Sequence, residues 1–164
     1  MSVKLVKLFI VLLISVTASA QAPPASAPPI PYGPPIGVEI AKKAAAAALA
    51  EARKNNWLMA TAVVDPNGTL VYYEKMDNTQ LGSAAVSIGK ARSAALYKRP
   101  TKVFQDMVAG GGAGLRILDL ENAVAIDGGV PIIVNGQVIG AIGVSGDSSD
   151  HDGVCAVAGA AALK

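Results

Sequence analysis

Residues 127–146 read Asp127-Gly-Gly-Val-Pro-Ile-Ile-Val-Asn-Gly-Gln-Val-Ile-Gly-Ala-Ile-Gly-Val-Ser-Gly146, and the rest of the predicted fold is arranged around them. Two apolar, β-branched runs, 130–134 and 138–144, flank the pair Asn135-Gly136. This pattern predicts a β-hairpin, because both central residues of a type I′ turn need positive φ. Both runs are too apolar for a strand that is wet on one face, so we expect other elements to cover them.

Three glycines lie in or directly after the second run: Gly140, Gly143 and Gly146. Glycine weakens a strand interior, and it is usually found there where another backbone or a ligand comes close. We therefore expect a helix, another subunit or a ligand to approach this strand closely.

The first 20 residues have the pattern of a secretory signal peptide. Lys4 and Lys7 precede an apolar run, 8–16, and Ala18-Ser-Ala20 fits a small-residue cleavage site. A membrane anchor is the alternative, but the run is too short to span a bilayer comfortably. We expect cleavage after Ala20 and a periplasmic or extracellular mature protein.

Residues 21–36 are expected to form a proline-rich linker ahead of a single domain at 37–164. Such sequence favours extended polyproline II structure over packed helices or sheets. Removing Lys4 and Lys7 from the 14 basic residues leaves 12, which balance the 12 acidic ones, so the overall charge does not indicate nucleic-acid binding. Cys155 is the only cysteine, which excludes an intrachain disulfide, and we expect it to be buried.

Periodicity and turn signals predict the remaining elements. Asp65-Pro-Asn-Gly68 predicts a turn between two strands, and Thr101 is expected to cap a short helix. In the last helix, Val154, Val157, Ala158 and Ala161 are expected to face inward. Helices are expected at 37–54, 81–98, 102–108 and from Ser148 or Ser149 onward, with strands at 59–64, 70–75, 123–126, 130–134 and 138–144. The predicted fold class is α/β, an α+β sandwich with a mainly antiparallel sheet of about five strands covered by helices.

His151 is the only histidine and the candidate metal ligand. The alternative, which the flanking acids favour, is a solvated histidine at a helix N-terminus. A hydrolase reading of Ser145 with His151 fails, because the sequence Gly143-Val-Ser-Gly-Asp147 does not match the Gly-x-Ser-x-Gly elbow.

Five basic residues and no acidic ones lie between residues 81 and 102. Tyr97, Thr101 and Phe104 lie among or beside them. Cations in such a cluster can hold carboxylates or phosphates, whereas the alternative is a solvated helix face balanced by acids elsewhere. The sequence leaves both interpretations open. The five basic residues of the cluster are Lys90, Arg92, Lys98, Arg99 and Lys102.

Several motifs carry a resemblance to a known family. Residues 63–77 read Val-Val-Asp-Pro-Asn-Gly-Thr-Leu-Val-Tyr-Tyr-Glu-Lys-Met-Asp, and 90–101 contain Lys-Ala-Arg-Ser-Ala-Ala and Arg-Pro-Thr. The hairpin sequence and Asp152 with Ala-Val-Ala-Gly at 156–159 complete the set. Together they resemble the GlcG/HbpS-type haem-binding family, also found as the C-terminal domain of PduO-type cobalamin adenosyltransferases. The resemblance covers about residues 37–163.

The resemblance implies an oligomeric protein that binds haem. If haem binds, we expect Lys90, Arg92, Lys98 or Arg99 of the basic cluster to pair with its propionates. Some members use a histidine of the first helix, which is absent here. The axial ligand is then expected to be His151, Tyr97, Thr101, a methionine such as Met107, or a residue of another subunit.

The leading hypothesis is an exported haem-binding homo-oligomer for haem scavenging, protection or sensing, with a membrane sensor or transporter as a further partner. The family includes members labelled as haem-degrading, so a haem-degrading or redox enzyme is the first alternative, although no reductant site is evident. A cofactor-free accessory subunit of an oligomeric assembly is the second.

Overall fold

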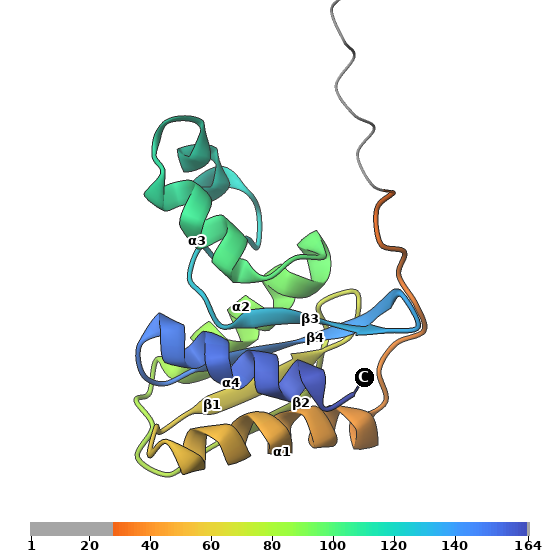
Figure 1. Cartoon of the computed structure of the whole chain (residues 1–164), viewed down its shortest axis with the longest axis vertical. Helices are drawn as coiled ribbons and strands as arrows, with labels where there is room; N and C mark the ends of the chain where they lie inside the picture. Colours follow the sequence, from red (N-terminus) through yellow and green to blue (C-terminus); the bar gives the residue numbers. More distant parts are fainter. Residues whose placement is uncertain (1–27, 164) are drawn as a thin grey trace, which may run out of the picture.

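The structure is a computed structural model that describes residues 28–163 (Figure 1). The predicted signal peptide lies outside the described residues. None of the helices within 28–163 is long and apolar enough to cross a membrane. The elements in chain order are α1 (Val38–Lys54), β1 (Ala60–Val64), β2 (Leu70–Lys75), α2 (Ser83–Tyr97), α3 (Thr101–Ala109), the 3₁₀ helix η1 (Gly112–Asp119), β3 (Gly129–Val134), β4 (Gln137–Ser145) and α4 (Ser149–Ala161).

The strands form one antiparallel sheet in the order β2-β1-β4-β3. The predicted class is confirmed, with four strands in place of about five. Residues 123–126 are not a strand, because this segment passes beside α2, where the Val124 amide donates to Ser93 Oγ at 3.1 Å. The Val124 amide is therefore bonded to a serine side chain and not to the backbone of a neighbouring strand.

The predicted central hairpin is confirmed. Asn135 and Gly136 both have positive φ, 49° and 74°, and connect β3 to β4 with Val134 opposite Gln137. The other turn also forms as expected: Gly68 has φ 81°, and Asp65 Oδ1 accepts from the amides of Asn67 and Thr69. Local turn chemistry therefore fixes both hairpins.

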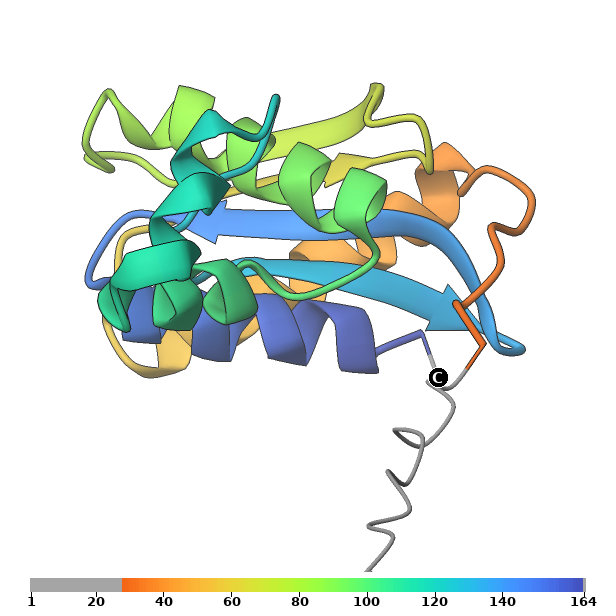
Figure 2. The ribbon, with the colours of Figure 1, turned by 90° about the horizontal axis from the view of Figure 1, so that it is seen from above.

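Helices cover both faces of the sheet (Figures 1 and 2). α1 and α4 pack on one face around Met59, Val63 and Ile142, while α2 packs on the other against Ala62 and Ala141. Every residue of β1 is consequently buried, and so is almost all of β4. This explains why the sequences of both strands lack a polar face.

Glycines in β4 and directly after it allow the close approaches predicted from the sequence. A Cβ atom added to Gly143 would lie 2.1 Å from the Ser87 carbonyl oxygen and 2.4 Å from the Ala91 nitrogen, both in α2. At Gly146 it would lie 2.0 Å from the Leu58 carbonyl oxygen. The element that approaches Gly143 is therefore a helix of the same chain.

The prediction of which residues of α4 face inward is wrong. Val154 and Val157 are 48% and 58% exposed, Ala161 is exposed, and Ala158 is only partly buried. The helix instead turns small residues inward, because its backbone lies very close to α1: a Cβ at Gly159 would be 2.8 Å from the Ala44 carbonyl oxygen. The buried residues of α4 are Asp152, Gly153, Cys155, Ala156, Gly159 and Ala160.

Residues 30–36 pack against the body of the domain, although the sequence placed them in a linker. We call this segment the strap. Its backbone pairs with β4: the Val138 amide donates to the Pro31 carbonyl oxygen at 3.0 Å, and the Gly33 amide donates to the Val138 carbonyl oxygen at 2.9 Å. Ile36 is 5% exposed and joins the core. The strap is thus part of the folded unit.

Candidate functional site

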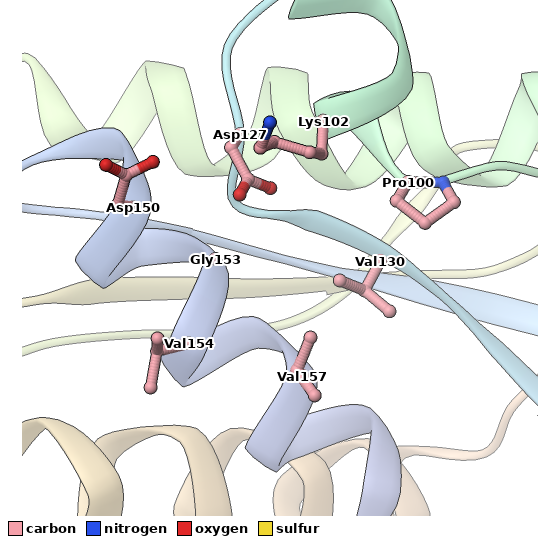
Figure 3. A pocket seen from close by; sticks show the side chains of 8 residues that line it. All are labelled: Pro100, Lys102, Asp127, Val130, Asp150, Gly153, Val154 and Val157. Atoms are coloured by element: carbon pink, nitrogen blue, oxygen red, sulfur yellow. The ribbon is translucent and has the colours of Figure 1, made fainter. Parts of the chain in front are cut away.

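An apolar groove runs over the edge strand β3, between α4 and the junction of α2 with α3 (Figure 3). Two adjoining cavities, of about 450 and 360 Å³, form it and share Pro100, Val130 and Val157. This is the size range of small-molecule and cofactor pockets. We call it the α3–α4 groove. Its other lining residues are Lys102, Asp127, Asp150, Gly153 and Val154 in the first cavity, and Ile30, Lys98, Arg99, Pro131, Ile133, Ala160 and Ala161 in the second.

The turn Lys98–Pro100 forms one wall of the groove. Lys98 ends α2 in the left-handed conformation, with φ 53°, and so redirects the chain into α3. Thr101 does not cap α3 as predicted, because Pro100 occupies the cap position. Thr101 Oγ1 instead accepts from the Gly129 amide at 2.9 Å, within a fully buried contact that fastens α3 to β3.

The two ends of the groove differ in charge. Lys98 and Arg99 line one end without an acidic residue among the lining groups there. At the other end, Lys102 lies beside Asp127 and Asp150 and pairs with Asp106 on its own helix. Burial raises the pKa of Asp127, although the hydrogen bond from the Gly128 amide and the charges of Lys102 and Lys90 oppose the shift. A carboxylate ligand is therefore favoured at the Lys98–Arg99 end.

Lys90 does not belong to this basic surface, contrary to its predicted role in propionate pairing. Its ammonium is fully buried, donating to Asp152 Oδ2 at 2.6 Å and to the Val144 carbonyl oxygen at 3.2 Å. Desolvation raises the pKa of Asp152, and the hydrogen bond from Lys90 opposes that shift. This pair ties α2, β4 and α4 together.

The structure brings together three of the five predicted site residues near the α2–α3 junction. Arg99 lines the groove, and Thr101 is buried next to two lining residues. Tyr97 packs edge-on against Phe104 and donates its hydroxyl to the Glu121 carbonyl oxygen at 2.6 Å. The side chain of Tyr97 is thereby directed toward the segment after η1.

The other two predicted site residues lie elsewhere. Arg92 Nε donates to the Gly68 carbonyl oxygen at 3.2 Å, on the β1–β2 turn. His151 stacks on Trp57, with ring centroids 3.9 Å apart and planes 12° apart, and its Nδ1 lies 3.5 Å from Asp147 Oδ2. Neither residue lines the groove. Among residues 28–163, no cluster of three His, Cys, Asp or Glu side chains could hold a metal ion.

Sequence reasoning missed most of the apolar lining. Val154 and Val157 were predicted to face the core, because apolar periodicity does not distinguish a core from a groove wall. Val130 was predicted only as part of a covered strand of the central hairpin. One signal for the groove was present in the sequence of α4. This helix has glycine and alanine residues for a tightly packed face and, in addition, valines that such a face does not bury.

Comparison with protein families matches residues 36–161 to the family described as haem degrading protein HbpS-like. The chain belongs to the HbpS-like family. Protein GlcG of Escherichia coli strain K12 is 41% identical over 107 residues, covering 65% of this chain and 78% of GlcG. The family predicted from the motifs is confirmed.

Solved structures of related proteins share the fold. A double mutant of HbpS from Streptomyces reticuli matches with a TM-score of 0.74 at 30% identity, covering 89% of this chain and 99% of that one. A complex of PduOC with haem matches with a TM-score of 0.71 at 26% identity, covering 79% of this chain and 96% of that one. One of these structural neighbours, PduOC, was thus solved in complex with haem.

Proposed function

We propose that this protein binds haem in the α3–α4 groove. The observation that carries the proposal is the pairing of an apolar groove with cations at one end only. Haem is a flat apolar ring with two carboxylates on one edge, and the groove offers Val130, Pro100 and Val157 for the ring and Arg99 with Lys98 for the carboxylates. The haem-bound PduOC neighbour supports the proposal.

The residues present fit the ring and its propionates. When bound, haem would supply a redox-active iron centre, and the groove residues would hold it, orient it and exclude water from one face. The acidic end of the groove repels the propionates, so Asp127 and Asp150 favour one orientation of the ligand. The described lining holds no His, Cys, Met or Tyr. The iron ligand is therefore not one of the lining residues. Thr101 is fully buried with its hydroxyl bonded to the Gly129 amide, and His151 stacks on Trp57 away from the groove, which leaves Tyr97, Met107 or a residue of another subunit as the candidates.

We further propose that the protein is exported, assembles as a homo-oligomer, and serves haem scavenging, protection or sensing with a membrane sensor or transporter. The N-terminal sequence pattern supports export. The apolar side chains exposed on α3 and η1 support assembly; they include Val103, Met107, Leu115 and Leu118. Mass spectrometry of the protein from its host is expected to show an N-terminus at Gln21, and light scattering of the purified protein a mass above the monomer.

Absorption spectroscopy tests haem binding. Titration of the purified protein with hemin is expected to shift the Soret band and saturate at a fixed ratio of hemin to protein. Val157→Asp would place a carboxylate in the apolar wall, on an already exposed position, and is expected to abolish saturation without unfolding the protein. Saturable binding that survives this change unaltered would contradict the groove as the site.

The family description favours haem degradation as the second function. Breaking the macrocycle needs a reductant, so the bound hemin should be incubated with ascorbate and its products identified. An intact Soret band after this treatment would argue for binding alone. If the protein binds no hemin at all, the result would favour the role of a cofactor-free accessory subunit.

A further inference from the structure

We infer that the strap is a brace for the ligand site, and that Tyr32 is a positioning residue that holds the Lys98–Pro100 turn in its groove-forming conformation. This inference rests on the proposed haem site, because it assigns the means by which that site keeps Arg99 in place. Tyr32 belongs to the segment that sequence reasoning treated as a linker.

The hydroxyl of Tyr32 caps the end of α2. The last carbonyl groups of a helix have no partner within the helix and must find one outside it. Tyr32 Oη donates toward two of them, the Ala95 oxygen at 3.1 Å and the Leu96 oxygen at 2.9 Å. A side chain more than 60 residues away thus satisfies the helix end immediately before the turn.

The strap also holds the side chain of Lys98. Its Nζ donates to the Ile30 carbonyl oxygen at 2.8 Å and lies 4.0 Å from the centre of the Tyr32 ring. A cation over an aromatic face is attracted by the negative face of the ring. Lys98 has a left-handed backbone, which is unfavourable for a residue with a Cβ atom, so these contacts compensate for a strained conformation.

The brace is itself fixed to the sheet. The backbone hydrogen bonds between β4 and residues 31–36 anchor the strap. Ile30 lines the same cavity as Arg99 and Pro100, so the strap forms part of the groove wall as well as its support. The position of Arg99 is consequently set from two directions, by α3 and by the strap.

Two variants separate the contributions of Tyr32. Tyr32→Phe removes the two hydroxyl bonds and retains the ring beneath Lys98, while Tyr32→Ala removes both. Hemin affinity is expected to fall about threefold in Tyr32→Phe and up to tenfold in Tyr32→Ala. Tyr72→Phe is the matched control: it also loses a hydroxyl hydrogen bond, to Glu74, but on β2 at the opposite edge of the sheet. Its hemin affinity is expected to be unchanged.

Combination with Arg99→Ala tests whether Tyr32 acts through Arg99. Residues that act as one unit give non-additive effects, so Tyr32→Ala with Arg99→Ala is expected to bind hemin as Arg99→Ala alone does. If the double variant loses as much hemin affinity as the product of the two single fold-losses, the positioning role is overturned.

Amide hydrogen exchange tests the brace without any ligand. Peptides covering residues 97–103 are expected to exchange faster in Tyr32→Ala than in the wild type or Tyr72→Phe, while peptides from β1 stay the same. Unchanged exchange at 97–103 overturns this inference. A wild-type protein that leaves the hemin spectrum unaltered overturns the proposed function instead, so the two failures are distinguishable.

Discussion

Lys90 of α2 and Asp152 of α4 form a buried ion pair. Nζ of Lys90 lies 2.6 Å from Oδ2 of Asp152, and the two side chains are only 1% and 4% exposed. Loss of one partner leaves a buried charge without compensation, which is far more costly than loss of the pair as a whole. The pair therefore makes the packing of α2 and α4 depend on two residues that are 62 positions apart.

Asp152→Ala is expected to lower the free energy of unfolding by about 3–5 kcal/mol, because the Lys90 ammonium remains buried without its carboxylate. Urea denaturation measures the change. The double variant Lys90→Met with Asp152→Leu is expected to be more stable than Asp152→Ala. Lys42→Ala is the control, since its pair with Glu39 is exposed, and it should leave the urea midpoint unchanged.

Gly143→Val is expected to destabilise the fold by about 1–3 kcal/mol, since its side chain would overlap the backbone of α2. Gly82→Ala serves as the comparison, because a Cβ there meets nothing within 4 Å and the backbone is already helical. Thermal melting of both variants measures the difference. Equal melting temperatures would mean that α2 can move away from β4 at little cost.

Arg99→Ala is expected to weaken hemin binding by up to tenfold, the effect of losing one partly exposed charged contact. Arg92→Ala tests the alternative position of the site, on the β1–β2 turn. Because Arg92 does not line the groove, we expect a smaller loss of affinity from it, measured by the same Soret titration. A larger loss of hemin affinity in Arg92→Ala than in Arg99→Ala would indicate that the site lies at the β1–β2 turn.

Asp127 should make stability depend on pH in the acidic range. Burial raises its pKa in the folded protein above the ordinary value of 3.8. The folded state then holds a proton that the unfolded state has lost, so the contribution of Asp127 to stability falls as the pH rises from about 3.8 to the raised pKa, and stays constant above it. Asp127→Asn is expected to flatten this part of the pH profile, which denaturation at several pH values measures.

The thiol of Cys155 is expected to be unreactive in the folded protein. Burial raises its pKa to about 12, and the thiolate is the reactive form. Ellman's reagent at pH 8 should label Cys155 slowly in buffer and completely in urea. Rapid labelling of the folded protein would show that α4 separates readily from the sheet.

The sequence by itself determined the features that depend on near neighbours in the chain. Positive φ at Asn135 and Gly136 requires particular residue types, so the central hairpin could be read directly, and so could the turn at Gly68. Gly143 indicated a close backbone approach because glycine in a strand is otherwise unfavourable. The resemblance of several motifs to a known family also identified the family.

Tertiary structure alone decided which side chains meet. The charge of Lys90 is visible in the sequence, but its burial depends on Asp152, which folding brings to it from another helix. The valines of α4 line the groove because this helix turns its small residues toward α1, where a Cβ at Gly159 would lie 2.8 Å from the Ala44 carbonyl oxygen. Likewise, Tyr32 meets the end of α2 only because the strap pairs with β4. Helical period and composition describe one segment at a time, whereas these contacts depend on the distances between segments.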